Sequence, residues 1–93
     1  MLSLDTAVRI PDQVFFTSLD DGSVLLDTRA SAYFALEDVG GRFWELLADG
    51  QPLAAIQRRL LDEYEVEPAE LERDLLELLD DLLEHGLVEP VQE

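Results

Sequence analysis

The sequence predicts an α+β fold, in which a three-stranded antiparallel sheet is followed by three helices in an arrangement similar to a winged helix-turn-helix. Short runs rich in aromatic and β-branched residues occupy the first third of the chain, and leucines at helical spacing dominate the rest. The chain has 93 residues. Because this length allows one modest hydrophobic core but not two, we expect a single domain over residues 1–93.

Turn residues divide the N-terminal part of the chain into three predicted strands. Asp20–Ser23 contains the Asp-Gly pair that hairpin turns favour, because the chain there needs a positive φ angle. Thr28–Ser31 is a second predicted turn, and Val8–Ile10 extends the start of the sheet. The predicted strands are Val14–Leu19, Val24–Asp27 and Tyr33–Leu36.

Capping residues and prolines mark the three helices. The first helix is predicted to begin at Asp38, a helix cap, and to end at Asp49–Gly50. Pro52 and Pro68 stand where the first residue of a helix is expected, since proline lacks the N–H that has no partner there. The third helix is the longest and ends at Gly86, a typical C-terminal capping glycine.

The third helix carries two adjacent leucine stripes that together span about 160° of its circumference. A helix that packs against one flat surface needs a narrower apolar arc. Either the helix is wedged between two other elements, or one stripe lines an unoccupied apolar groove, and both alternatives stay open. After the helix, Leu87–Val88 is predicted to form a terminal strand or an apolar tail contact that ends at Pro90. The stripes are Leu71, Leu75, Leu78 and Leu82, and Leu76, Leu79 and Leu83.

The chain is strongly acidic. Its 6 basic residues, all arginines, stand against 22 acidic ones, which gives a formal net charge of −16. The excess is concentrated in the last third, where Arg73 is the single basic residue. Such a field repels phosphate backbones and anionic membranes and favours a basic partner, although solubility alone also explains it. We therefore expect no nucleic-acid or membrane partner.

No set of residues suited to catalysis or cofactor binding stands out. Cysteine is absent, which excludes thiolate chemistry and is compatible with a reducing cytoplasm. The single histidine, His85, lies in the last turn of the third helix, where capping is favoured over catalysis. Without a second histidine or a glycine-rich phosphate loop, neither a metal nor a nucleotide cofactor is expected. Met1–Asp5 shows no targeting signal, and we expect a cytoplasmic protein that is not an enzyme.

Aromatic residues on the first predicted strand and the first predicted helix are candidates for the core or for ligand binding. Aromatic side chains within apolar periodic segments usually belong to the core. We therefore expect Phe15 and Phe16 on the first strand and Phe43 on the first helix to be buried, and Trp44 to be partly exposed. Stacking of these rings on a ligand is the alternative.

Several segments, taken in order, carry a resemblance to a known family. Val24–Asp27 precedes the motif Tyr33–Gly40, and Phe43–Leu47 and the Gly86–Leu87 ending follow it. This order resembles the PqqD-like family of peptide-recognition domains over nearly the whole chain. The family motif usually has Leu-Asn ahead of its Val-Gly pair, whereas here Glu37 stands in place of the asparagine.

The resemblance implies a module that binds the leader part of a ribosomally made precursor peptide as an extra strand on the third strand, beside the third helix. An edge strand suits this role independently, because its unpaired N–H and C=O groups are satisfied by an added strand. Asp74, on the rim of the leucine stripe, would pair with a basic leader residue. By position, the peptide-binding residues are Tyr33, Phe34, Ala35 and Leu36 at the strand edge and Leu71, Leu75 and Leu78 in the groove wall.

Within the family, the small stand-alone form most resembles the leader-binding half of the split lasso-peptide B proteins, whose companion is a separate cysteine peptidase. This implies a basic leader with a Tyr, Pro and Leu motif. Two alternatives stay open. One is a PqqD-type peptide chaperone for a radical enzyme of quinone-cofactor biosynthesis, and the other is an acidic winged-helix domain that binds a basic protein or a DNA-binding partner without any leader peptide.

Overall fold

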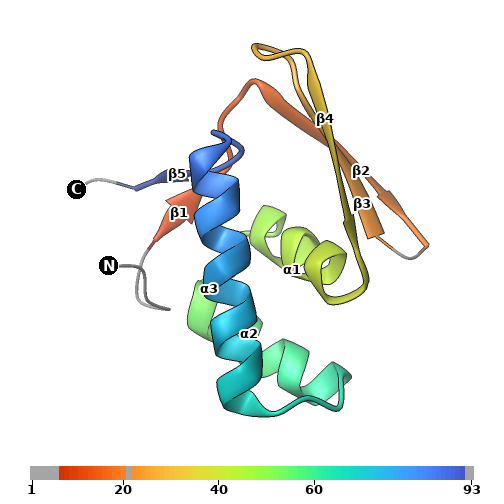
Figure 1. Ribbon diagram of the computed structural model, residues 1–93, viewed down its shortest axis with the longest axis vertical. Coiled ribbons are helices and arrows are strands. Elements are labelled where there is room, and N and C mark those ends of the chain that lie inside the picture. The colour runs from red at the N-terminus through yellow and green to blue at the C-terminus, as the bar shows by residue number, and fades with distance from the viewer. Residues whose placement is uncertain (1–6, 21, 92–93) are drawn as a thin grey trace.

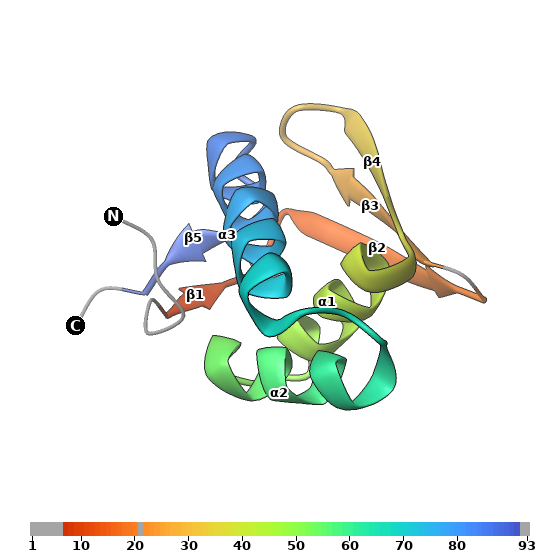
Figure 2. The same ribbon diagram turned by 60° about the horizontal axis from the view of Figure 1, so that its bottom comes forward.

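A computed structural model of the protein describes residues 7–20 and 22–91. A three-stranded sheet is followed by three helices, as predicted, and a short two-stranded ribbon lies apart from the sheet. Figure 1 and Figure 2 both place α1 between the sheet and α3. The N-terminal segment, for which no targeting signal is predicted, lies outside the described residues. Within the described part, no helix is long and apolar enough to cross a membrane.

The three strands of the sheet form an antiparallel meander with β3 in the centre. They are β2 (Val14–Leu19), β3 (Gly22–Asp27) and β4 (Ala32–Glu37). β2 has the predicted bounds, whereas β3 begins two residues earlier than predicted and β4 is one residue longer at each end. β4 is therefore an edge strand of this sheet.

Gly22 lies in strand β3, which corrects its predicted place in the turn. Leu19 pairs with Gly22, and Asp20 lies in the turn, whereas Asp21 lies outside the described residues. A Cβ atom on Gly22 would lie 2.1 Å from the carbonyl oxygen of Leu36, and one on Gly41 would lie 2.6 Å from the Cα atom of Gly22. This Gly22–Gly41 contact lets the sheet and α1 approach closely.

The predicted turn at Thr28–Ser31 is present, and Asp27 organises it. The Oδ1 atom of Asp27 accepts hydrogen bonds from the N–H groups of Arg29, at 3.0 Å, and Ala30, at 3.3 Å. Aspartate is favoured at this position because its side chain can pair backbone donors that the turn leaves without partners. The turn returns the chain along β3 as strand β4.

Helix α1 (Asp38–Ala48) follows β4 without an intervening loop. Asp38 has a φ angle of 52°, in the left-handed region that aspartate tolerates better than most residues. Glu37 occupies the N-cap position and makes no side-chain capping hydrogen bond. The prediction that Asp38 caps the helix is wrong, because this residue instead turns the chain from strand into helix. The helix ends as predicted, with Gly50 at a φ angle of 88°.

Helices α2 (Leu53–Glu63) and α3 (Pro68–Glu84) begin close to the predicted prolines. Pro68 is the first residue of α3, as expected. Pro52 precedes α2 at the N-cap position, one residue before the predicted place. The long α3 packs one side against the core and carries its acidic residues on the other.

The end of α3 is a Schellman motif. The N–H of Gly86 donates to the carbonyl of Leu83, at 3.1 Å, and the N–H of Leu87 donates to that of Leu82, at 2.9 Å. Gly86 has a φ angle of 73°, which confirms it as the capping glycine. The motif turns Leu87 and Val88 into the core, where both are buried. The apolar tail contact is therefore confirmed.

Strand β1 (Val8–Arg9) pairs with β5 (Glu89–Pro90) and not with the meander. The prediction that Val8–Ile10 extends the sheet is wrong, because the Schellman turn brings the C-terminal segment alongside β1. An ion pair between Arg9 and Glu89 joins the same two strands. This ribbon ties the two ends of the described chain together.

The core fills the space between α1, the sheet and α3. Phe43 is buried as predicted, but Trp44 is also fully buried, with its ring in edge contact with Phe16, so its predicted partial exposure is wrong. Phe15 and Phe16 are exposed, which contradicts their predicted burial. α1 covers the central strand at Leu25 and leaves most of β2 uncovered, so aromatic residues of β2 remain at the surface.

Candidate functional site

The outer edge of β4 is open. Among the described residues, β4 pairs only with β3. The hydrogen bond from Thr28 N–H to the carbonyl of Gln13 fixes the alternation of bonded pairs in the meander. Bonded and non-bonded pairs alternate along both strand pairs of the meander. With the observed register, the N–H and C=O groups of Phe34 point toward β3, and those of Tyr33 and Ala35 point away from it. Donors and acceptors of β4 are thus available to another strand.

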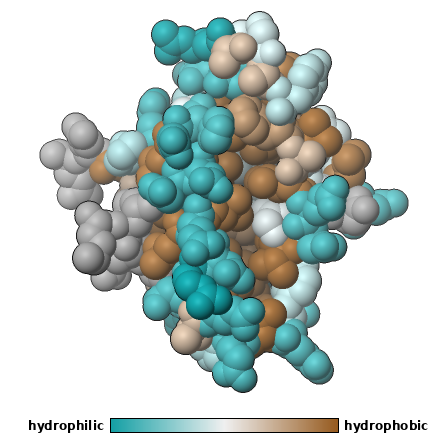
Figure 3. Space-filling view, viewed as in Figure 1, coloured by the Kyte–Doolittle hydropathy of each residue, from teal (hydrophilic) through white to brown (hydrophobic). Residues whose placement is uncertain are grey.

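An apolar pocket of about 150 Å³ lies beside this edge, between the first half of α3 and the start of α1. Four of the predicted binding residues line it. Figure 3 shows a continuous hydrophobic strip between the hydrophilic face of α3 and the sheet. The pocket is lined by Val39, Gly40, Val66, Glu70, Leu71, Asp74, Leu75 and Leu78.

Gly40 connects the pocket to β4. A Cβ atom at this position would lie 3.7 Å from Cδ2 of Leu78 and 3.9 Å from Cβ of Leu36. Side chains from α3 and β4 therefore both approach the first turn of α1, which forms the floor of a groove between these two elements. We call the space bounded by β4, α3 and this floor the β4–α3 groove.

His85 and Phe34 close the other end of the β4–α3 groove. Their rings are edge to face, with centroids 5.2 Å apart. Nδ1 of His85 lies 2.8 Å from the carbonyl oxygen of Asp81, so the histidine contacts the last turn of α3 as its predicted capping role requires. The same ring also links α3 to the edge strand, a contact that the sequence does not predict.

Acidic side chains border the pocket on α3. Glu70 and Asp74 lie one helical turn apart on the same face, both exposed. Arg73 lies 3.9 Å from the Asp74 carboxylate, but both side chains are more than half exposed, so this pair is weak. The rim of an apolar pocket is thus negatively charged, which suits an apolar side chain followed or preceded by a basic one.

Glu63 fixes α1, the floor of the groove, to α2. Arg42 of α1 donates two hydrogen bonds to its carboxylate, at 2.8 and 3.0 Å, and Arg59 donates a third at 3.1 Å. These charge-assisted bonds, with the Arg42 bonds foremost, lower the pKa of Glu63 from 4.5 to about 2, although burial acts in the opposite direction. The cluster is structural and lies away from the groove.

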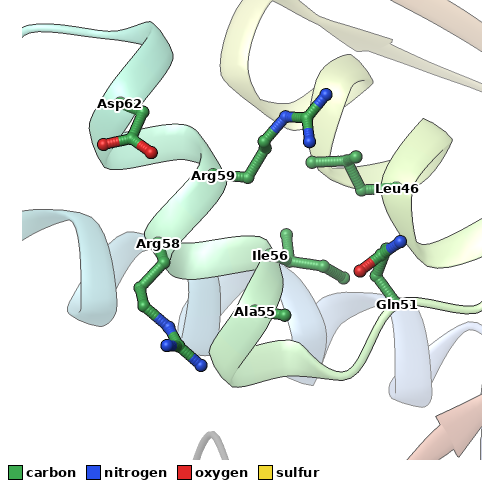
Figure 4. Close-up of a pocket in the computed structure, with 7 residues that line it drawn as sticks. All are labelled: Leu46, Gln51, Ala55, Ile56, Arg58, Arg59 and Asp62. Carbon is green, nitrogen blue, oxygen red and sulfur yellow. The ribbon is translucent and has the colours of Figure 1, made fainter.

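A second pocket, of about 370 Å³, lies between α1 and α2. Figure 4 shows that its charged side chains do not converge, because Arg58 and Asp62 point in different directions from α2. Arg59, which also borders it, is already paired with Glu63. This arrangement offers no focused binding position, so the β4–α3 groove is the better candidate.

The structure brings most of the predicted site residues together. Leu71, Leu75, Leu78 and Asp74 share the pocket, and Leu36 adjoins it. Phe34 and Leu36 face the helices, whereas Tyr33 and Ala35 face the opposite side of the sheet. Leu71 and Leu75 are each 3 % exposed, so they belong to the core as well as to the pocket wall.

Other lining residues were not predicted. Glu70 lies four residues before Asp74, so helical periodicity could have identified it. Val39 and Gly40 are in the motif after β4 but show no separate signal. Val66 and His85 come from segments whose position beside the groove depends on tertiary packing, so the sequence contains no local pattern that identifies them.

The chain is similar to a known protein family and to solved structures. Residues 22–88 match the family model described as coenzyme PQQ synthesis protein D (PqqD). No protein of curated function matches the chain. A structure of TbiB1 in complex with the TbiA(beta) leader peptide is 35% identical, covers 91% of this chain and 99% of its own, and has a TM-score of 0.85. A structure of lasso peptide synthetase B1 complexed with the leader peptide is 35% identical, with coverage of 89% and 98% and a TM-score of 0.79.

Proposed function

As the chain belongs to the PqqD family, we propose that it binds the leader region of a ribosomally synthesised precursor peptide in the β4–α3 groove. The leader adds as a strand to the outer edge of β4. The observation that carries this proposal is the open edge at Tyr33 and Ala35 beside an apolar pocket. Both similar structures are leader-peptide complexes, which supports the same ligand class for this chain.

In strand addition, backbone hydrogen bonds and side-chain contacts have different roles. Backbone hydrogen bonds to β4 provide affinity that depends little on the leader sequence, and alternate leader side chains turn toward the groove and provide selectivity. An apolar cavity of about 150 Å³ can hold a benzene-sized group. The pocket near Leu78 therefore accepts one aliphatic or cyclic leader side chain.

A basic leader is favoured by charge. Glu70 and Asp74 border the pocket, and the whole chain carries −16. Opposite charge raises the rate of encounter and orients the peptide as it approaches. Basic leader residues next to the one whose side chain enters the pocket would lie near these two carboxylates.

The chain acts as a recognition protein without a catalytic role of its own. It delivers the bound precursor to a modifying enzyme, for which we take the leader peptidase of lasso-peptide biosynthesis, because one of the similar structures is of lasso peptide synthetase B1. The description of the matched family favours a second candidate, a peptide chaperone for a radical enzyme in quinone-cofactor synthesis. Both use the same groove and differ in the enzyme that receives the peptide.

Two substitutions on α3 test the groove. Leu78→Asp places a carboxylate in the pocket, and Leu76→Asp is its matched control, because Leu76 is also half-buried on α3 but borders a different surface, with Ala69 and Asp80. Fluorescence anisotropy with labelled lasso-type and PQQ-type leader peptides measures the affinity of each variant. We expect Leu78→Asp to weaken binding of the cognate leader at least tenfold and Leu76→Asp to change it less than twofold. Equal effects of the two variants on leader affinity would exclude the β4–α3 groove as the leader-binding site.

Leu75 is unsuited to this test. Its side chain is 3 % exposed in the core, so an aspartate there would leave a buried, unpaired carboxylate and destabilise the fold. Loss of binding by that variant would not distinguish a damaged groove from an unfolded chain. Leu78 avoids this difficulty because it is only half-buried.

A further inference from the structure

No described element packs on the side of the sheet turned away from α1 (Figure 1 and Figure 2). Most side chains on this side are apolar. The register aligns Phe15, Leu26 and Tyr33 in one row across the three strands, and Thr17, Val24 and Ala35 in the next. Leu19 adds a further apolar side chain at the end of β2. We call this surface the outer face; its apolar residues are Phe15, Leu19, Val24, Leu26, Tyr33 and Ala35.

The outer face is larger than scattered surface residues would produce. Phe15 is 60%, Leu19 53% and Tyr33 74% exposed. With typical side-chain areas, these three alone expose roughly 300–400 Å² of mostly apolar surface. Contiguous apolar patches of this size on a monomer are often interaction sites. The area is about half of what one partner contributes to a standard interface, so it suits a reversible complex.

Charged residues give the outer face two different ends. Asp20 and Glu37 are exposed at the end with the β2–β3 turn, and Arg29 is exposed at the end with the β3–β4 turn. A second copy of this chain is a poor occupant, because each copy carries −16 and the two would repel each other. A partner with an apolar patch and basic residues where it meets Asp20 and Glu37 is complementary.

The outer face adjoins the edge used in the proposed function. Tyr33 and Ala35 direct their side chains to the outer face and their free backbone groups to the proposed leader strand. Outward side chains of a bound leader would lie next to these two residues and widen the face by one strand. A protein that docks there can contact the leader and this chain together.

We propose that the outer face docks the enzyme that processes the leader-bearing precursor, through an apolar patch on that enzyme with arginine or lysine at the end that meets Asp20 and Glu37. This inference rests on the proposed function, because it identifies the enzyme by its need to reach the bound leader. The groove holds the peptide, and the opposite side of the same sheet holds the enzyme.

The test measures enzyme binding and leader binding separately. The probe is a purified leader peptidase of lasso-peptide biosynthesis, titrated against the immobilised full chain by biolayer interferometry. Phe15→Ser/Leu19→Ser removes apolar surface from β2, away from the groove, and Thr17→Arg places a cation in the middle of the outer face. Val91→Ser is the matched control, since Val91 is an exposed apolar residue outside this face.

Both outer-face variants are expected to weaken peptidase binding at least tenfold and to change leader affinity less than twofold, while the Val91 control changes neither. Unaltered leader affinity also shows that the variants are folded. Unchanged peptidase affinity in both outer-face variants would overturn the proposal, as would sedimentation showing that the chain dimerises through this face. The separate leader titration tests the proposed function of the groove. That function would be overturned if the unmodified chain bound no leader.

Discussion

Replacing Ala35 with proline tests strand addition at the level of a single backbone donor. The N–H of Ala35 points away from β3, so proline removes a donor from the open edge without removing a bond of the sheet. A hydrogen bond contributes about 0.5–1.5 kcal/mol net, and a leader carbonyl left without a partner costs about 1–3 kcal/mol. At 1.4 kcal/mol per factor of ten, the expected loss of leader affinity is roughly 5- to 100-fold.

Isothermal titration calorimetry with the cognate leader measures this loss. Ala35→Val is the control, because valine suits a strand and keeps the N–H. Circular dichroism and thermal unfolding of both variants show whether the meander is intact. A folded proline variant that binds the leader as tightly as the valine variant would refute the use of this edge, or would place the leader in a register that leaves the N–H of Ala35 unused.

Three further predictions concern stability and association. Gly22→Ala places a Cβ atom 2.1 Å from the carbonyl oxygen of Leu36, so we expect about 2–3 kcal/mol of destabilisation, measured by urea unfolding, and a change below 0.5 kcal/mol would contradict the close contact. The lowered pKa of Glu63 stabilises the fold fully above pH 4.5, and this contribution is lost as the pH falls through about 2. Because the Glu63 side chain is 30% exposed, Glu63→Gln should cost only about 1 kcal/mol at pH 7, a deficit that disappears near pH 2 in denaturant titrations. Leader association, followed by stopped flow, should slow roughly tenfold between low and high salt; a rate independent of salt would leave solubility as the reason for the acidic surface.

Elements with strong local signals agree with their predictions. Pro68 and Gly86 bound α3, because proline fits the first helical residue and glycine adopts the left-handed conformation of a Schellman motif at low cost. Gly50 ends α1 for the same reason. The strands were predicted to within two residues, since β-forming runs separated by turn residues specify a meander without reference to the rest of the chain.

Features that depend on distant residues were not predicted. Arg9 and Glu89 are 80 positions apart, and no local pattern pairs them. Trp44 is fully buried and contacts Phe16 of β2, which the pattern of α1 alone does not reveal. Gly22 resembled a turn glycine, and its role in close packing depends on Gly41, in a different element.

The candidate site also has features that the sequence predicted and features that it did not. The position of β4 as an edge strand followed from the order of predicted strands, and the leucine stripes of α3 correctly indicated apolar surface beyond one packing contact. The two alternatives for that helix both apply in part, because Leu75 is buried in the core whereas Leu78 borders the groove. The contact between Phe34 and His85 was not predicted, because β4 and the end of α3 come together only in the complete fold.

The Gly22–Gly41 contact has a consequence for how such a protein could change its peptide preference. With no side chain between them, the sheet and α1 are already at their closest separation, so the position of the sheet against α1, at the floor of the β4–α3 groove, is fixed. New preferences would then arise from exchanges at lining positions such as Val39 or Leu78, which alter the shape of the recess and leave its frame unchanged. Relatives with different cognate peptides are expected to keep small residues at both glycine positions and to diverge at the lining ones.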